Sequence, residues 1–528
     1  MTRCARLGGL LVVLLLAVGG LMDPAPATAQ ARPSGELTVA LSSLATETLD
    51  PALGGHIVKF YLSQIFDYLV GVTPDGKLSK DTGVAYRWDV SGDHTRWTFY
   101  LRKGIKFHNG EELTSDDVKF SILRGIGKRS TTGYAGPLRA LVAEVETPAP
   151  DRVVIVTKEP TLIVPSYLSR ALSTEGMILP KKYIEAKGDD YFATNPIGTG
   201  PYRFVERVTG SYLKIEAVES HWRAGTPRYK ALFFRLVPEE TTRVAMLRQG
   251  KADIIDLSRD RLKEVQADGF PIHLRKDDAH IDYWWIEPWD KTPVKDRRVR
   301  EALNLAIDRK ELAETVFAGL AEPGPIPYGL TWSFPDVGFK VTPELGYPYD
   351  PARAKKLLAE AGYPNGFSTE MFAYRLPGLP EGRAMAEAVA GYWEKIGVQT
   401  KLVPLDYPAF RKKWFDRSAP GALGYYNMAN RNWIGTYALI EKYVNPKEKT
   451  AAVHDPELES MIAAVTRQTD QAKVDALMRN IFTRLRTESL GIPLVSLHTP
   501  YATAKKIASW NPGSVMYDLN LDELVASK

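Results

Sequence analysis

Cysteine and histidine are scarce in this 528-residue chain, which contains one cysteine, Cys4, and eight histidines. No two histidines flank a glutamate at the spacing by which zinc proteases bind their metal, and the glycine–serine–glycine elbow of serine hydrolases is absent. Adjacent acidic residues such as Glu239 and Glu240 are more typical of a solvated surface than of the paired carboxyls of a glycosidase. The sequence therefore indicates no catalytic residue set, no metal site and no cofactor.

A concentrated charge of either sign is also missing. The chain has 68 lysines and arginines against 63 aspartates and glutamates, a net charge of +5, and the two signs alternate along its length. Nucleic-acid binding needs a concentrated basic face that neutralises phosphates, so we expect no nucleic-acid partner. After the first thirty residues, no apolar run is long enough to cross a membrane.

The first thirty residues have the three parts of a secretory signal peptide. Arg3 and Arg6 precede an apolar run at 7–21, and the small residues at 27–29 match the site that signal peptidase cleaves. The run is shorter than the roughly 18 apolar residues of a membrane-spanning helix, so an uncleaved anchor is the weaker alternative. Cleavage of residues 1–29 after Ala29 would remove Cys4 and leave an exported chain without a thiol or a disulfide.

The rest of the sequence alternates between strand patterns and helix patterns. Short apolar segments predict strands at 37–41, 97–101, 153–157, 202–206, 213–218 and 232–237, the first of them buried on one face only. Proline, aspartate and glycine at 74–76 predict a turn between two strands. Capping residues predict helices that begin at Thr114, Asp296, Asp350 and Asp455. Strands and helices that alternate without a fixed repeat predict mixed α/β lobes.

Five segments of the chain carry motifs in a consistent order. They are WTFYLRKGIKFHNG at 97–110 followed by LTSDDV at 113–118, NPIGTGPY at 195–202, RVAMLRQGKAD at 243–253, DRRVREALNLAIDR at 296–309, and YDPARA to GY at 349–363. Together they resemble the family 5 extracytoplasmic solute-binding proteins, the dipeptide- and oligopeptide-binding-like receptors of ABC importers. The motifs themselves are rich in turn glycines and helix caps, so we expect them to form the scaffold and not the ligand site.

The resemblance implies a periplasmic binding protein fold of type II, similar to cluster C, in which two α/β lobes face each other across a ligand-binding cleft. We expect a first lobe at 31–55, 195–285 and 498–528, an extra subdomain of that lobe at 56–194, and a second lobe at 286–497. The resemblance also implies a periplasmic monomer that captures a small-molecule solute. It would deliver this solute to the membrane permease subunits of an ABC importer, which have a cytoplasmic ATPase behind them.

By position, the resemblance places ligand contacts in the loop after the first strand, at the end of the first lobe, and in two loops of the second lobe. The residues so implied are Thr46, Glu47, Tyr283, Trp284, Trp285, Tyr374, Arg375, Asn427, Asn430, Arg431, Asn432 and Trp433. Two buried aromatic rings would dominate the apolar part of binding at ~25 cal/mol per Å². Each tryptophan is equally compatible with a place in the core.

One segment departs from the family pattern. Peptide-binding members carry an aspartate in a second-lobe loop that pairs with the α-ammonium of the peptide, whereas the matching residues 421–433 contain no acid. Because an unpaired buried ammonium costs ~3–5 kcal/mol, we hypothesise that free-amino peptides are poor ligands. A polar neutral or anionic, partly apolar solute suits asparagine, arginine and tryptophan better. Asp282 or Glu287 could still replace the missing acid.

Two other functions are compatible with the same sequence. The first is an exported hydrolase that uses this fold, which turnover of candidate substrates would reveal. The second is a ligand sensor that docks on a membrane receptor, which neighbouring permease and ATPase genes would distinguish from a transport protein.

Overall fold

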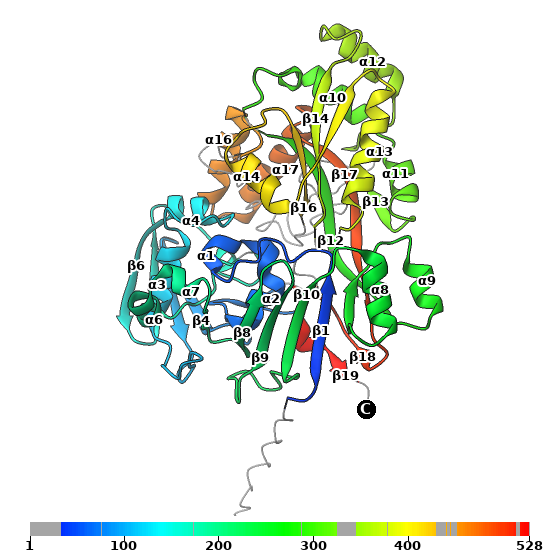
Figure 1. The fold of residues 1–528 in the computed structure, drawn as a ribbon. Helices are drawn as coiled ribbons and strands as arrows, with labels where there is room; N and C mark the ends of the chain where they lie inside the picture. Colours follow the sequence, from blue (N-terminus) through cyan, green and yellow to red (C-terminus); the bar gives the residue numbers. More distant parts are fainter. Residues whose placement is uncertain are drawn as a thin grey trace, which may run out of the picture.

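The computed structural model describes residues 33–74, 77–172, 174–286, 288–324, 345–376, 379–428, 440, 444, 451–513 and 518–526. The predicted signal peptide lies outside these ranges, as do Glu287 and the candidate ligand residues Asn430, Arg431, Asn432 and Trp433. Within them the chain forms two lobes, one above the other in Figure 1, which confirms the predicted fold class. Over the same ranges, no helix combines the length and the hydrophobicity that crossing a lipid bilayer requires.

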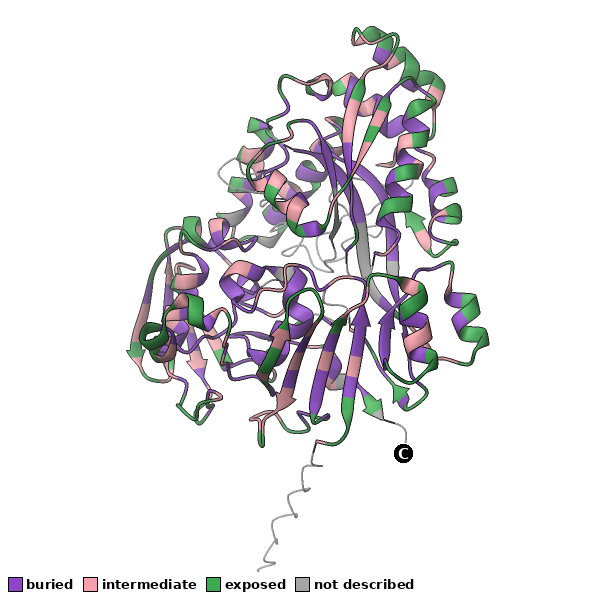
Figure 2. Cartoon of the chain, in the orientation of Figure 1, coloured by how far each residue is buried: buried purple, intermediate pink, exposed green. Residues whose placement is uncertain are grey.

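A single sheet runs through both lobes. Within the described ranges it has eleven strands in the order β15-β14-β16-β12-β17-β11-β1-β10-β9-β8, and β13 pairs with β17 beside this path. Their bounds are β1 (Glu36–Leu41), β8 (Tyr202–Val208), β9 (Tyr212–Ala217), β10 (Ala231–Leu236), β11 (Ile254–Asp256), β12 (Ile272–Trp285), β13 (Ala321–Pro323), β14 (Ser368–Ala373), β15 (Gln399–Pro404), β16 (Leu423–Met428) and β17 (Ile492–Thr503). Figure 2 shows buried residues along these strands and exposed residues on the outer faces of the helices.

Strands β12 and β17 connect the lobes. They are 14 and 12 residues long and pair antiparallel, with a shift of register between Arg275 and Ala279. The C-terminal part of β12 pairs with β16 in the upper part of Figure 1. The C-terminal end of β17 pairs with β11 in the lower part. The two lobes therefore share two neighbouring extended strands, about which they can change their relative orientation.

The part of the molecule around β1 is called the first lobe here. Besides β1 and β8–β11 it contains α1 (Pro51–Gly54), α2 (Lys59–Ile65), α8 (Glu240–Arg248), α9 (Leu262–Ala267), β18 (Ile507–Ser509), β19 (Val525–Ala526) and the hairpin of β2 (Gly71–Val72) and β3 (Leu78–Ser79). The β2–β3 pairing confirms the predicted strand–turn–strand unit around residues 74–76, of which 75 and 76 lie outside the described ranges.

A separate four-stranded sheet lies beside the first lobe, in the region where the sequence predicts a subdomain (Figure 1). Its strand order is β4-β5-β7-β6, with bounds β4 (Ala85–Val90), β5 (Arg96–Leu101), β6 (Val142–Ala149) and β7 (Arg152–Thr157). The helices of this region are α3 (Ser115–Gly125), α4 (Ala135–Leu141), α5 (Val164–Tyr167), α6 (Lys181–Lys187) and α7 (Asp189–Phe192). The residue ranges predicted for the lobes and the subdomain stay predictions.

The second lobe is built on β13–β16 and the adjoining ends of β12 and β17. Its helices are α10 (Arg297–Leu305), α11 (Arg309–Thr315), α12 (Pro351–Glu360), α13 (Gly382–Glu394), α14 (Tyr407–Phe415), α16 (Pro456–Thr466) and α17 (Gln471–Thr487). In Figure 1, α14, α16 and α17 lie on the side of the lobe nearer the four-stranded sheet, and α11 and α13 lie on the other side.

The helix starts predicted from capping residues are confirmed. Thr114 and Asp117 form a capping box at the start of α3, and the Asp296 side chain accepts the Arg298 N–H at the start of α10. Asp350 and Asp455 cap α12 and α16 in the same way, each with proline as the first helical residue. Each cap satisfies N–H groups that have no partner inside the helix, which is why a short local motif sets the helix boundary.

The predicted one-sided burial of β1 is wrong. Val39, Ala40 and Leu41 are all buried, so both faces of the strand are covered. The reason is that β1 is an interior strand with β10 and β11 parallel on either side, and parallel strands in such sheets are covered on both faces.

The motifs at 97–110 and 195–202 meet in the scaffold of the first lobe. His108 Nδ1 accepts the Gly198 N–H at 3.2 Å, and Nε2 donates to the Gly200 carbonyl at 3.0 Å. Burial lowers the pKa of His108 to about 4, so the ring is neutral at neutral pH and can keep both bonds. A Cβ on Gly198 would lie 2.1 Å from the Ile65 carbonyl oxygen, which explains why this loop needs glycine.

Candidate functional site

The two lobes contact each other through a buried ion pair close to β12 and β17. Arg259 follows β11 in the first lobe, and Glu381 is the N-cap residue of α13 in the second. Arg259 Nη1 lies 2.8 Å from Glu381 Oε1, and the same oxygen accepts the Arg259 backbone N–H at 3.0 Å. The two side chains are 0% and 6% exposed, and the guanidinium also lies over the ring of Phe317. This pair brings the facing ends of the lobes together.

Three arginines of the second lobe form contacts with the first lobe or with the region of the four-stranded sheet beside it. Arg375 donates to the Pro238 carbonyl at 3.3 Å and lies 3.9 Å from the Glu239 carboxylate. Arg411 donates to the Thr131 carbonyl at 2.6 Å, and Arg467 pairs with Glu159 at 2.5 Å. The residues bridged by Arg411 and Arg467 belong to the region of the four-stranded sheet. The lobes are therefore in direct contact through these arginines as well as through the pair of Arg259 with Glu381.

The loop after β1 presents Thr46 and Glu47 at the end of the strand that faces the second lobe (Figure 1). Thr46 Oγ1 is buried, and no described residue forms a hydrogen bond with it. The Glu47 carboxylate accepts the Gly210 N–H at 2.9 Å, and its carbonyl accepts a hydrogen bond from Arg207 at 2.5 Å. The two neighbouring candidate residues thus differ, because the first lobe engages Glu47, whereas the buried Thr46 hydroxyl has no hydrogen-bond partner among the described residues.

The aromatic residues at the end of β12 are fully enclosed. Tyr283, Trp284 and Trp285 are at most 1% exposed, and the Trp284 ring lies 5.6 Å from that of Trp414 on α14. Trp284 therefore helps to fill the space between the sheet and α14. Trp285 points to the opposite side of the strand because side chains alternate, and its indole N–H has no partner among the described residues.

Tyr374 and Arg375 follow β14 but lie in different surroundings. Tyr374 is buried and stacks on Phe410 with ring centroids 4.3 Å apart, so its ring packs inside the second lobe. Arg375 is exposed and reaches the first lobe, as described above. Asn427 lies in β16 opposite Ile281, and its side chain is outside the described set. The structure thus places Arg375 in contact with the first lobe, and it places Thr46 and Glu47 in the loop that follows β1.

Asp282, one of the two acids that could replace the missing aspartate, is buried in β12. The buried guanidinium of Arg309 is close enough to be influenced by it. Burial lowers the pKa of Arg309 to about 10, and Tyr347 and Asp282 act in the opposite direction. Asp282 thus already has a buried cation as a neighbour, which makes it a weaker candidate for pairing with a ligand ammonium.

Sequence reasoning missed two kinds of contact: the pair of Arg259 with Glu381, which joins the lobes, and the bond of Arg207 with Glu47 inside the first lobe. The partners are 122 positions apart in the first case and 160 in the second. Neither pair belongs to a motif or a local pattern. Charge alone could not identify these partners, because the chain has 68 lysines and arginines with which an acid could pair.

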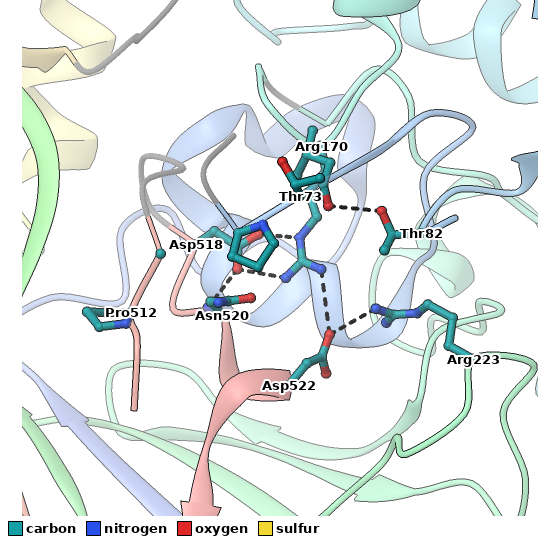
Figure 3. Close-up of a pocket in the computed structure, with 11 residues that line it drawn as sticks. Thr73, Thr82, Arg170, Arg223, Pro512, Asp518, Asn520 and Asp522 are labelled. Carbon is teal, nitrogen blue, oxygen red and sulfur yellow. Dashed lines mark hydrogen bonds and ion pairs between the residues drawn. The ribbon is translucent and has the colours of Figure 1, made fainter. Parts of the chain in front are cut away.

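A cluster of charged residues around a small pocket joins the C-terminal segment to the region of the four-stranded sheet (Figure 3). Arg170 pairs with Asp518 at 2.5 Å, and Arg223 pairs with Asp522 at 3.0 Å. Lys59 is buried behind Arg170 and donates to its carbonyl, and burial lowers the pKa of this lysine to about 7. Since these charges pair with one another, we interpret the cluster as a structural junction.

Metal ligation is not suggested by the described residues, among which no group of three or more histidine, cysteine or acidic side chains is suitably placed. Both ring nitrogens of His273 lie within hydrogen-bond distance of other groups of the chain. Nδ1 lies 2.9 Å from the Trp510 carbonyl, and Nε2 lies 3.1 Å from Thr503 Oγ1.

Comparison with known proteins agrees with this architecture. The sequence profile described as "Bacterial extracellular solute-binding proteins, family 5 Middle" matches residues 82–453. Heme-binding protein A of Haemophilus influenzae is 31% identical over 374 residues, which are 66% of this chain and 66% of that protein, just under two thirds of its length. Glutathione-binding protein GsiB of Pectobacterium atrosepticum is 25% identical over 494 residues, 90% of this chain and 91% of that protein.

Among solved structures, the periplasmic binding protein DppA of Helicobacter pylori, in complex with the peptide STSA, has the same fold. The TM-score is 0.82 with 20% sequence identity, and the match covers 94% of this chain and 99% of that one. With the profile match covering well over half of its length, this chain belongs to the family 5 bacterial extracellular solute-binding proteins.

Proposed function

We propose that this protein is the periplasmic receptor of an ABC importer, which captures a solute between its lobes and delivers it unchanged to a membrane permease. The observation that carries this proposal is the arrangement of two lobes that, among the described residues, are connected by β12 and β17 of the central sheet and contact each other through arginines. Such a molecule is a two-state clamp. A solute that touches both lobes favours the closed state by its difference in affinity for the two states.

For the ligand, we propose a polar neutral or anionic solute, possessing an apolar part, in preference to a free-amino peptide. The absence of an acid from 421–433 supports this, and so does the exposed cation of Arg375 at the facing surface of the second lobe. The Thr46 hydroxyl can accept or donate one hydrogen bond to the same solute. The names of relatives indicate that the family accommodates chemically different cargo, including heme, glutathione and peptides.

The test is calorimetric titration with four solutes, called the solute panel here: Ser-Thr-Ser-Ala, its N-acetylated form, glutathione and heme. The two tetrapeptide forms differ only in the ammonium, so their comparison isolates the missing acid. We expect N-acetylation to leave binding unchanged or to strengthen it. Tight binding of the free-amino peptide that N-acetylation abolishes would contradict the ligand proposal, because it would require an acid that pairs with the ammonium.

The transport role needs a separate readout. We expect a solute recovered from the complex to have its original mass, because binding proteins carry out no covalent step. A recovered product of different mass would favour the hydrolase alternative. Loss of solute uptake in cells that lack the protein, restored by the gene, would support import over sensing.

A further inference from the structure

The loop after β1 has a strained backbone on both sides of Thr46. Ala45 has φ of 58° and Glu47 has φ of 52°, in the left-handed region that residues with a Cβ rarely adopt. Such conformations persist only where the surrounding structure imposes them, and they concentrate at ligand clamps and active sites. The loop therefore needs an external restraint.

That restraint comes from β8 and the turn that follows it. The Gly210 N–H donates to Glu47 Oε2 at 2.9 Å, and Arg207 Nη1 donates to the Glu47 carbonyl at 2.5 Å. The Glu47 N–H donates to the Leu44 carbonyl at 3.2 Å, which closes the loop on itself. Glu47 is thus held through its carboxylate and through both polar groups of its backbone.

Thr46, between the two strained residues, has the opposite character. Its Oγ1 atom is buried, and none of the described residues bonds to it. A buried hydroxyl without a partner is costly, so its retention between two restrained residues of this loop indicates a partner that comes from outside the chain. Two residues after Thr46, the Tyr61 hydroxyl restrains the chain by donating to the Thr48 carbonyl at 2.9 Å.

We propose that Glu47 and Arg207 are positioning residues that hold this loop so that the Thr46 hydroxyl is preorganised to hydrogen-bond the solute. The proposal rests on the proposed function and assigns to Glu47 a role that acts through Thr46 and not through contact with the solute. Preorganisation increases affinity because the loop has no ordering entropy left to lose when the solute binds.

The first experiment needs no solute. Amide hydrogen exchange of the ligand-free, full-length protein reports the order of residues 43–48 in the variants Glu47→Ala, Glu47→Gln and Arg207→Ala. We expect exchange at Ala45 and at position 47 to accelerate about tenfold in the two alanine variants. Glu47→Gln should stay close to wild type because its amide oxygen can still accept the Gly210 N–H. Glu206→Ala, which removes a neighbouring exposed carboxylate on β8, is the matched control. Unchanged exchange in Glu47→Ala and Arg207→Ala would overturn the proposal.

The second experiment is a double-mutant cycle on binding of the member of the solute panel that the wild-type protein binds most tightly. Thr46→Val and Glu47→Ala should each weaken binding about tenfold, the value of one hydrogen bond. The double variant should be little weaker than either single variant, since Glu47 acts through the hydroxyl that Thr46→Val removes. Additive effects, or a loss in Glu47→Gln as large as in Glu47→Ala, would overturn the positioning role. If the wild type binds no member of the panel, the ligand proposal fails, while the exchange experiment still decides the role of Glu47.

Discussion

Removing Glu381 should open the clamp. In Glu381→Ala, Arg259 would keep its buried position in the closed state without the carboxylate that now lies 2.8 Å away. Leaving one partner of a buried pair unpaired costs ~3–5 kcal/mol. If the pair exists only when the lobes are in contact, this whole cost falls on the closed state. An increase of about 3 kcal/mol in its free energy lowers the closed population, and therefore the solute affinity, by a factor of about 100.

Small-angle X-ray scattering of the ligand-free and solute-saturated protein measures this opening as a larger radius of gyration. The matched control is Glu370→Ala, which removes an exposed pair with Lys401 at the same distance of 2.8 Å and should change neither the radius nor the affinity. The double variant Arg259→Met with Glu381→Leu should recover much of the closure, because apolar residues of similar size often replace a buried pair without loss. The reasoning is refuted if Glu381→Ala lowers the melting temperature while the radius and the solute affinity stay at their wild-type values. That result would mean that the pair is present in both states.

Three further predictions concern the scaffold. Burial lowers the pKa of Lys59 from 10.5 to about 7. Between these two pH values the unfolded chain binds more protons than the folded protein, so the free energy of unfolding should rise by up to about 1.4 kcal/mol per pH unit above pH 7. In Lys59→Met, urea titrations should show this slope abolished, and an unchanged slope would contradict the assignment. Burial alone would raise the pKa of Asp67, but its bond with His221 and other contacts hold this pKa at about 2. The ionised Asp67 therefore stabilises the fold fully above pH 3.8, and this stabilisation is lost as the pH falls toward 2. Asp67→Asn should therefore cost about 2 kcal/mol at pH 6 by urea unfolding, with the difference from wild type vanishing near pH 2; an equal difference at both pH values would argue against the pairing. Gly198→Ala should destabilise the first lobe by more than about 2 kcal/mol in thermal unfolding because its Cβ would lie 2.1 Å from the Ile65 carbonyl oxygen, and a variant as stable as wild type would show that the loop can shift.

The features that the sequence predicted correctly depend on neighbours in the chain. Asp296, Asp350 and Asp455 each cap a helix by bonding to an N–H two or three residues away, so a window of a few residues contains all the information. The fold class was available for a different reason. It followed from the resemblance of the motif segments to a known family, and these segments form part of the scaffold, as His108 does with the loop at 195–202.

What the sequence could not supply depends on residues far apart in the chain. The burial of β1 on both faces requires residues distant in the sequence, such as Val244 and Leu247 of α8, which pack in one cluster with Ala40 and come about 200 residues later. Trp284 was compatible with the core or the cleft until its place opposite α14 was known, because the face that a strand residue occupies depends on sheet register. Glu47 was expected to contact ligand from its position alone, and its bonds to Arg207 and Gly210, which are 160 and 163 positions away, could not be read from the sequence.

The claim on which the whole account depends is that the lobes close on one solute and release it unaltered. Native mass spectrometry of the full-length protein mixed with the solute panel, followed by the mass of whatever solute is released on denaturation, tests it directly. The account predicts a complex of one protein with one solute, and a released solute of its original mass. A released molecule of changed mass, or the absence of any stoichiometric complex with protein exported and purified under native conditions, would contradict it.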